Sequence, residues 1–153
     1  MTVAASLLMA EGMREPSPAR QRTLALHRRV IAFSTHVNKS YPRSEMDYPS
    51  EIVWKQLVRA ADSASNNLVE AGNGSSDADF LNKMRLALRE AREAHACLQK
   101  IQMGALANAQ HILELQLQDE AYQLCAIFTA IIRNMSLRLA DERQERRRHR
   151  KGL

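Results

Sequence analysis

The sequence contains few of the residues that break helices and few aromatic side chains. Its 153 residues include only five glycines and four prolines, and aromatic residues make up 5%. Alanine, leucine, glutamine, glutamate and arginine are plentiful, and these residues favour helix over other backbone states. This composition predicts helix along most of the chain. A chain of this length is most simply one domain that is large enough to bury a core.

Cysteine is scarce as well. Cys97 and Cys125 lie in apolar stretches with helical periodicity, and no Cys-x-x-Cys spacing occurs. The sequence therefore offers no cysteine motif for metal binding or redox chemistry. We interpret both residues as small buried apolar side chains in a reducing cytoplasm.

Long apolar runs are missing from the sequence. No stretch approaches the roughly 18 apolar residues that a membrane-spanning helix requires. The mildly apolar segment from Thr2 to Ala10 has no basic region before it and is short for the apolar part of a signal peptide. We therefore expect a cytoplasmic protein that does not bind a membrane.

The usual motifs for catalysis are also missing. There is no phosphate-binding loop, no glycine-rich dinucleotide turn and no nucleophile elbow. A di-metal site in a helical bundle needs Glu-x-x-His motifs on two helices, yet none of the five histidines has a glutamate three residues before it. Leu24 to Tyr41 contains no acidic residue at all. We expect no metal, no cofactor and no enzymatic activity.

Positive charge is in excess, and most of the excess lies at the C-terminal end. Lysine and arginine number 22 against 17 acidic residues, which gives a net charge of +5. Six basic residues account for most of this imbalance: Arg143, Arg146, Arg147, Arg148, Arg150 and Lys151. A second basic group lies near the start of the first expected helix: Arg20, Arg22, Arg28 and Arg29.

The basic C-terminal tail has two interpretations. It is either a solvated helix end, where positive charge suits the helix dipole, or a phosphate-binding segment whose contacts are independent of sequence and sensitive to salt. If several copies associate so that their tails converge, their local charge adds up and the phosphate-binding interpretation is favoured. The arginines near the start of the first helix would add a second basic surface.

Apolar residues recur at helical spacing in four segments. We expect helices over residues 20–39, 50–71, 76–104 and about 110–138, with a turn or loop near 105–110. Ser50 and Ser76 are the expected N-caps, the second with Asp79 three residues later. In the last helix Leu113 and Leu117 are expected to begin the buried stripe.

These segments define the expected architecture. Four amphipathic helices with short connections predict an all-α fold, an antiparallel up-down four-helix bundle over residues 20–140. Residues 1–19 are expected to form an irregular arm, and residues 141–153 a fraying basic extension.

The second expected helix carries an unusual run of small residues from Arg59 to Gly72. Ala60, Ala64, Leu68 and Ala71 share one helix face, which would let a neighbouring backbone approach closely. Polar residues are spaced three or four apart in the same run, so that they can pair along the helix: Arg59 with Asp62, Asp62 with Asn66, and Asn67 with Glu70.

These polar residues have two interpretations. Arg59, Asp62, Asn67 and Glu70 could form a catalytic group, or a buried polar network that fixes helix register or joins subunits. We favour the network, because a buried polar group needs a partner.

The aromatic residues have two interpretations, as platforms for nucleic-acid bases or as packing residues. Trp54, Tyr48 and Tyr122 could stack on nucleic-acid bases, but basic residues do not interleave with them in a recognisable pattern. We therefore favour packing in the core or at an interface. His95 is likewise interpreted as a core or interface histidine.

The run Arg59-Ala60-Ala61-Asp62-Ser63, followed by Asn67-Leu68-Val69-Glu70, resembles the signature of the small "four helix bundle proteins". These include proteins encoded by intervening sequences within bacterial 23S ribosomal RNA genes. Pro42 and Glu45 in the first link and Phe80-Leu81 after a Gly/Ser turn support the resemblance. It covers roughly Leu24 to Leu139.

The resemblance implies an up-down bundle that assembles into a ring, commonly a homopentamer, with no known catalysis. A related branch, the accessory variability determinant of diversity-generating retroelements, forms a basic pentameric barrel that binds a reverse transcriptase and nucleic acid. Our leading hypothesis is a homo-oligomer that binds nucleic acid, RNA in preference, through phosphate electrostatics. The alternatives are a scaffold for a protein partner such as a reverse transcriptase, and a bundle that only self-associates.

Overall fold

The computed structural model describes residues 18–73 and 76–152. Within these ranges the regular elements are all helices: α2 (Pro18–Ser40), α3 (Tyr48–Gly72), α4 (Asp77–Met103), α5 (Ala109–Glu114) and α6 (Leu117–Arg150). The prediction of an all-α fold is confirmed within these ranges. The irregular arm expected at residues 1–19 lies outside the described residues, except for its last two positions, which already belong to α2.

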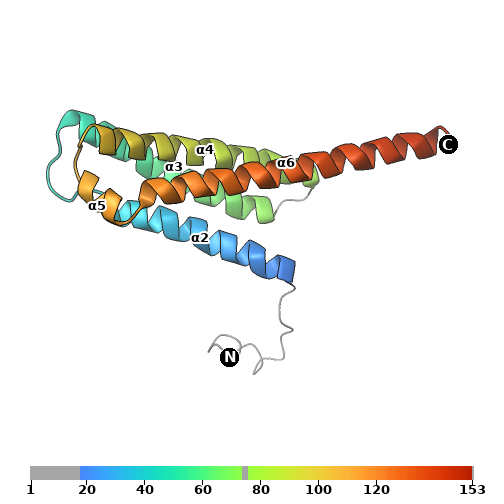
Figure 1. Cartoon of the computed structure of the whole chain (residues 1–153), viewed down its shortest axis with the longest axis horizontal. Coiled ribbons are helices and arrows are strands. Elements are labelled where there is room, and N and C mark those ends of the chain that lie inside the picture. The colour runs from blue at the N-terminus through green and yellow to red at the C-terminus, as the bar shows by residue number, and fades with distance from the viewer. Residues whose placement is uncertain (1–17, 74–75, 153) are drawn as a thin grey trace, which may run out of the picture.

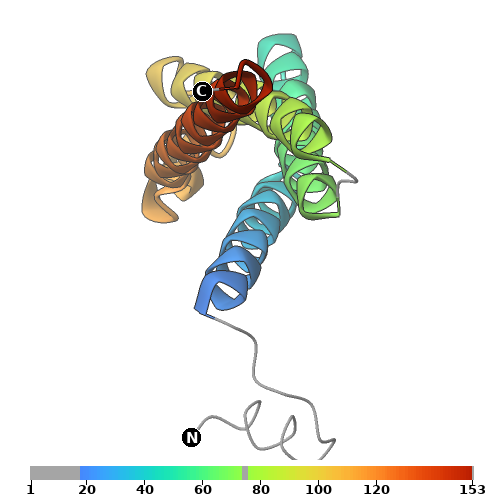
Figure 2. The same cartoon turned by 90° about the vertical axis from the view of Figure 1, so that its right-hand side faces the viewer.

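The long helix α3 lies at the centre of the arrangement. It packs against α2 on one side and most extensively against α4, and α4 packs in turn against α6 (Figure 1). In Figure 1 the colours show that successive long helices run in opposite directions. α2 and α6 contact each other little, and in the end-on view of Figure 2 the N-terminal part of α2 points away from the other helices. The closed antiparallel four-helix bundle therefore stays a prediction.

The small-residue run of α3 is buried as its periodicity predicts. Ala60, Ala64, Leu68 and Ala71 are each at most 3% exposed. α4 also buries three alanines in the same core (Ala87, Ala91 and Ala94). Because side-chain size at the contact sets how close two helices approach, alanines on both helices allow the extensive α3–α4 packing.

Two helix starts test the expected caps. The side-chain oxygen of Ser76 accepts a hydrogen bond from the Asp79 backbone N–H at 3.1 Å, so the cap expected for α4 is confirmed. The expectation that Ser50 caps α3 is wrong, because α3 begins at Tyr48 and the Asp47 carboxylate accepts from the Ser50 N–H at 3.0 Å. Proline is tolerated in the first helical turn, which lets the helix begin ahead of Pro49.

The segment before α6 is broken where the sequence predicted a continuous stripe. Ala105, Asn108 and Gln116 all have positive φ, and Gln116 separates the short α5 from α6. This backbone turn leaves Leu113 57% exposed, so its expected place in the core is wrong. From Leu117 onward the predicted stripe is confirmed by the burial of Leu117, Ala121, Leu124 and Phe128.

The connection between α4 and α6 covers one end of α2 and α3. The Trp54 indole N–H donates to the Ala107 carbonyl at 2.8 Å, and the Ala107 N–H donates to the Ser50 hydroxyl at 3.2 Å. The Asn108 side-chain amide donates to the Ser40 carbonyl at 2.9 Å. Polar groups at the helix ends are thus paired by the connection, which fixes where α6 starts.

The basic C-terminal segment continues the last helix. α6 has 34 residues and continues to Arg150. Its Arg138 lies 3.8 Å from Asp77, the first residue of α4, so α6 extends beyond α4 from about Leu139 onward. At about 1.5 Å per residue this part is about 18 Å long. Figure 1 shows it projecting from the body, and we call residues 139–150 the overhang.

Candidate nucleic-acid interface

The overhang separates its charges onto two faces. Arg143, Arg146, Arg147 and Arg150 are spaced at i, i+3, i+4 and i+7, which places them on one side of the helix. We call these four residues the arginine face. Asp141 and Glu145 fall on the opposite side by the same spacing, whereas Glu142 lies one turn before Arg146 at the edge of the arginine face. The overhang therefore concentrates its positive charge on one side, and of its arginines only Arg148 lies on the other side.

Most of the basic side chains on the overhang have no acidic partner. Glu142 lies 3.7 Å from Arg138 and 4.0 Å from Arg146, and both pairs span one helical turn. Among the described residues, no carboxylate lies within ion-pair distance of these exposed side chains: Arg143, Arg147, Arg148, Arg150 and Lys151. These charged groups are solvated and unpaired, so a phosphate can bind them without breaking an ion pair.

The arginines of α2 are not equivalent to those of the overhang. Arg22 and Arg28 are exposed, and the side chain of Arg20 lies outside the described residues. Arg29 donates to both carboxylate oxygens of Glu120 at 2.7 and 2.9 Å and to the Gln123 side-chain oxygen at 2.6 Å. Hydrogen bonding to Glu120 raises the pKa of Arg29. This residue joins α2 to α6, so we no longer favour it as a phosphate contact.

The two basic groups lie at the same end of the molecule. In Figure 1 the N-terminal end of α2 and the overhang of α6 both point to the right. Figure 2 shows that they stand apart there, with α2 directed away from α6. In one chain they therefore form two separate basic surfaces.

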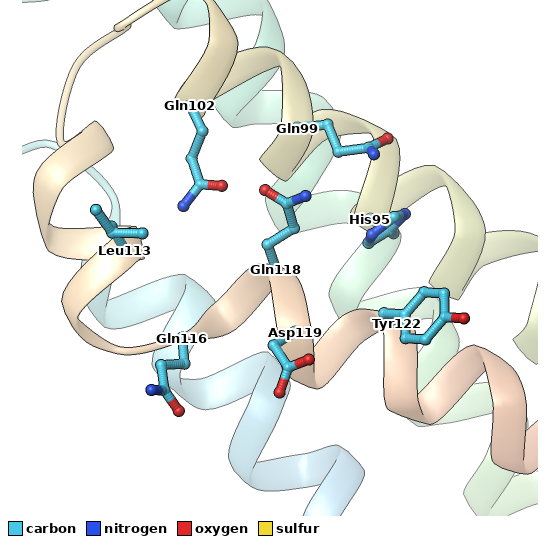
Figure 3. A pocket seen from close by; sticks show the side chains of 8 residues that line it. All are labelled: His95, Gln99, Gln102, Leu113, Gln116, Gln118, Asp119 and Tyr122. Carbon is cyan, nitrogen blue, oxygen red and sulfur yellow. The ribbon is translucent and has the colours of Figure 1, made fainter.

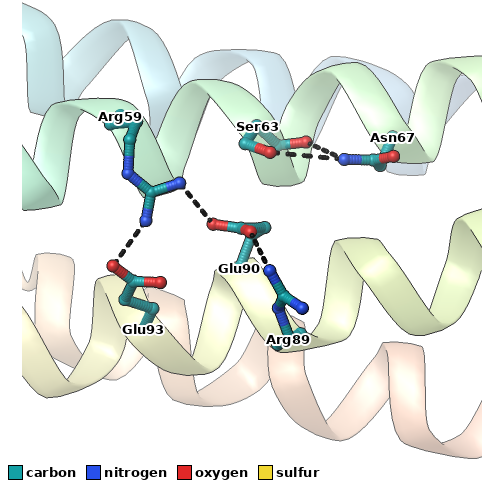
Figure 4. Close-up of polar contacts among 6 residues, drawn as sticks. All are labelled: Arg59, Ser63, Asn67, Arg89, Glu90 and Glu93. Carbon is teal, nitrogen blue, oxygen red and sulfur yellow. Dashed lines mark hydrogen bonds and ion pairs between the residues drawn. The ribbon is translucent and has the colours of Figure 1, made fainter.

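The polar residues of α3 reach across to neighbouring helices rather than along their own. Arg59 donates to Glu90 at 3.1 Å and also to Glu93, both on α4 (Figure 4). Glu70 pairs with Lys83 of α4 at 2.6 Å. The expected pairing of Arg59 with Asp62 and of Asn67 with Glu70 along the helix is not what these side chains form.

Of the other two members of the predicted network, one contacts another helix and one does not. Asp62 accepts hydrogen bonds from Ser34 and, at 3.0 Å, from Asn38, both on α2. Asn67 stays within α3 and donates to the Ser63 carbonyl at 2.9 Å (Figure 4). The central helix is thus joined to α2 by Asp62 and to α4 by Arg59 and Glu70. Such pairs fix how the three helices are aligned.

Removing Arg59 and removing Glu90 should destabilise the protein by different amounts. The Glu90 side chain is 7% exposed, whereas that of Arg59 is 55% exposed. We expect Arg59→Ala to lower the free energy of unfolding by about 1–3 kcal/mol, because it leaves a buried carboxylate with only Arg89 nearby. Glu90→Gln should cost less, since Arg59 keeps Glu93 and water. Urea unfolding of both variants checks this order, with Lys55→Ala as the exposed control; equal losses for both variants would contradict it.

The aromatic residues divide into one buried and two exposed side chains. Trp54 is fully buried and packs edge-on against Tyr41, with ring centroids 6.0 Å apart, so it cannot stack on a base. Tyr48 and Tyr122 are 74% and 64% exposed. Tyr122 of α6 lies next to His95 of α4, with ring centroids 6.0 Å apart (Figure 3). The packing interpretation therefore suits Trp54 but not Tyr122.

A hollow of about 590 Å³ lies beside this pair of rings, between α4 and α6. Figure 3 shows the glutamine side chains that line it along with His95, Tyr122, Leu113 and Asp119: Gln99, Gln102, Gln116 and Gln118. Amides both donate and accept hydrogen bonds, so this surface suits a polar, uncharged ligand group better than an ion.

A row of arginines on α4 was missed in the sequence. Arg85, Arg89 and Arg92 are exposed and spaced at i, i+4 and i+7, so they lie on one face of α4. Arg89 lies 3.4 Å from the buried Glu90. The spacing of these three arginines in the sequence is sufficient to place them on one helix face.

Other kinds of site have little support in the described part of the chain. Burial raises the pKa of the Cys97 and Cys125 thiols, which disfavours the reactive thiolate. Within residues 18–73 and 76–152, no three side chains of the types that bind metals lie close enough together to hold an ion. None of the described helices combines the length and apolar character needed to cross a membrane.

Comparison with known proteins identifies the family. The chain is similar to a crystal structure of a protein of unknown function from the S23 ribosomal protein family of Bacteroides thetaiotaomicron, with 23% identity and a TM-score of 0.57. The similarity covers 70% of this chain and 97% of that one, and at this identity it supports the fold alone. No curated protein matches the chain.

The family model described as "23S rRNA-intervening sequence protein" matches residues 19–130. The match includes α2 to α5 and the first part of α6, and it ends before the overhang. The arginine face is therefore an observation about this chain and not a property taken from the family. Because the match covers well over half of the sequence, the chain belongs to the 23S rRNA-intervening sequence protein family.

Proposed function

We propose that this protein is a non-enzymatic, homo-oligomeric four-helix bundle that binds RNA through its phosphates. The observation that carries the proposal is the overhang, a helix that projects from the body with four arginines on one face. Three of them, Arg143, Arg147 and Arg150, have no acidic partner among the described residues. A row of arginines along one helix face suits a row of phosphates.

The energetics of the overhang favour a phosphate backbone as the ligand. The desolvation cost of an exposed arginine is small. The favourable binding free energy of each phosphate contact therefore comes mainly from the release of counterions from the nucleic acid. This binding is independent of base sequence and falls steeply as salt rises. If several copies of the chain form one assembly, their overhangs present several arginine faces to the same RNA and the effective affinity increases.

Self-association is supported by the open side between α2 and α6. A groove of about 550 Å³ lies there, lined mainly by apolar atoms of Ala25, Leu26, Ile127 and Ile131, with Arg22 and Arg29 beside them. A second copy that covers this groove would bury apolar surface that the limited contact between α2 and α6 leaves open within one chain. We propose a ring, with five copies as the first size to test.

The same groove supports a second candidate function, a scaffold for a protein partner such as a reverse transcriptase. In that case the apolar groove, rather than the overhang, makes the main contact. The two functions differ in their salt dependence, since apolar contacts strengthen or persist as salt rises while phosphate contacts weaken.

The test is light-scattering mass of the full chain across a salt series, with and without a labelled structured RNA. We expect an oligomer of constant mass that binds RNA at low salt and releases it steeply at higher salt. A stable oligomer that ignores RNA at every salt concentration would overturn RNA binding and favour the scaffold. A monomer would overturn the homo-oligomer.

A further inference from the structure

Three hollows follow one another along the same side of the α4–α6 pair. The first, beside His95 and Tyr122, has about 590 Å³. The second, about 410 Å³, lies between Arg92 of α4 and the stretch of α6 from Tyr122 to Arg133. The third, about 610 Å³, lies between the start of α4 and the start of the overhang, and is lined by Arg85 and Arg143. We call this line of hollows the seam.

The hollows follow one line because the first two share a residue and the last two lie on one side of α6. Tyr122 lines both the first and the second hollow. Along α6, Thr129 of the second hollow and Ser136 and Arg143 of the third are each seven residues apart, which keeps them on one side of the helix. From Tyr122 to Arg146 the path is about 36 Å long at about 1.5 Å per residue.

Basic residues border this path on both helices. Arg85 and Arg92 lie on the α4 side, and Arg133 and Arg143 on the α6 side. All four are exposed, and none has an acidic partner within ion-pair distance among the described residues. The path leads directly onto the arginine face of the overhang, since Arg146 also lines the third hollow.

Acidic residues occur along the seam only near its two ends, within the described part of the chain. Asp77 and Glu142 line the third hollow, and each lies within 4.0 Å of Arg138. Asp119 lines the first hollow and accepts a hydrogen bond from Gln123 at 2.7 Å. The second hollow, which lies between Arg92 and Arg133, therefore has basic but no acidic residues in its lining.

An exposed aromatic ring stands at the end of this basic path. Tyr122 is 64% exposed and is flanked by His95 and the glutamine-lined hollow. A basic groove that follows the backbone, combined with an aromatic platform, is the arrangement by which proteins bind single-stranded nucleic acid without sequence preference. A duplex keeps its bases stacked inside and offers none to Tyr122.

We infer that the α4–α6 seam binds a single strand of RNA, with its phosphates along Arg85, Arg92 and Arg133 and a base stacked on Tyr122. This inference rests on the proposed RNA binding and deepens it, because it names the form of the RNA and a second contact surface. The strand enters at the arginine face of the overhang and ends at Tyr122. The glutamines beyond Tyr122 offer hydrogen bonds to the edge of the stacked base.

The test measures binding of the full chain to a fluorescently labelled oligouridine of about 15 nucleotides, a length within the range of single-strand sites. The seam variant combines Arg85→Ala, Arg92→Ala and Arg133→Ala. The matched control, Lys39→Ala with Arg43→Ala and Lys55→Ala, removes the same charge from α2, the following link and α3. Tyr122→Leu removes the ring, and Tyr122→Phe keeps it.

We expect the seam variant to reduce the slope of log affinity against log salt by about 2, at about 0.7 per phosphate contact of a single strand. The control should leave this slope unchanged. Tyr122→Leu should weaken binding about tenfold, whereas Tyr122→Phe should bind like the unaltered protein. A duplex RNA of the same length should be insensitive to Tyr122→Leu.

The other outcomes distinguish failure of the seam inference from failure of RNA binding. If the unaltered protein binds oligouridine but the seam variant matches the control, the seam inference fails while RNA binding stands. If Tyr122→Leu changes the light-scattering mass, the seam is an interface between copies and the inference fails. If the unaltered protein binds neither RNA at low salt, the proposed function fails together with it. Circular dichroism of every variant verifies that the helices are intact.

Discussion

Trp54→Ala is expected to lower the free energy of unfolding by about 3–5 kcal/mol, the usual cost of removing a large aromatic side chain from a core. Trp54 is completely buried, and its ring packs against Tyr41. Its indole N–H also donates to the Ala107 carbonyl at 2.8 Å. The substitution therefore removes core contacts and leaves a carbonyl of the α4–α5 connection without its partner. The measurement is urea unfolding followed by circular dichroism.

A conservative substitution separates these two contributions. Trp54→Phe keeps most of the apolar ring but removes the indole N–H, so we expect a loss of about 1–2 kcal/mol. Both variants must be compared at one protein concentration, because oligomerisation adds to the apparent stability. A loss below about 1 kcal/mol for Trp54→Ala would show that the connection over the end of α3 relaxes into the space, and that this end of the molecule is not fixed by the indole.

The helices and most of their buried faces were predictable from sequence because both depend on local periodicity. Val30, Phe33 and Val37 in α2, and the alanines of α3, are buried as their spacing predicts. The exceptions depend on backbone angles. Leu113 fits the periodicity of the last helix, but the left-handed conformation at Gln116 breaks the helix and turns Leu113 outward. An asparagine or glycine would have signalled such a turn, and glutamine does not.

The C-terminal end of the last helix, Arg150 instead of the expected residue 138, could not be predicted for a different reason. An apolar stripe predicts a helix only where the helix has a packing partner, and the overhang has none beyond about Leu139. Its helix is supported instead by residues with high helix propensity, by ion pairs one turn apart such as Glu142 with Arg146, and by arginines at the C-terminal end of the helix dipole. The position of the arginine face follows from that helix.

Side-chain partners were the least predictable part of the candidate site. Sequence spacing identifies neighbours on the same helix, and it therefore suggested that Arg59 pairs with Asp62. In the structure Arg59 reaches Glu90 and Glu93 of α4, whereas Asp62 reaches α2. Arg29 illustrates the consequence for function, since its pairing with Glu120 removes it from the predicted phosphate contacts. The seam could not be predicted either, because it depends on which face of α4 meets α6.

Replacing the arginine face with glutamine is expected to have the largest effect on RNA binding. The variant combines Arg143→Gln, Arg146→Gln, Arg147→Gln and Arg150→Gln, and glutamine retains the high helix propensity of arginine. Each lost phosphate contact should reduce the slope of log affinity against log salt by about 0.7–0.9, so four lost contacts reduce it by about 3. We expect a loss in affinity of about a hundredfold near physiological salt, for single-stranded and duplex RNA alike. Fluorescence anisotropy across a salt series measures both quantities.

The opposite face of the overhang provides the matched control. Asp141→Asn with Glu145→Gln removes negative charge from the same helical turns without touching an arginine. If the overhang binds phosphate, this control should strengthen binding, because the local positive charge rises. If the glutamine variant and the acidic-face control both bind RNA like the unaltered protein, the overhang is a solvated helix end, and the seam and α2 are left as the only candidate RNA contacts. If RNA affinity falls in the glutamine variant and rises in the acidic-face control, the RNA binds at the overhang itself. Electrostatic attraction from a distant surface would be screened over about 8–10 Å at these salt concentrations.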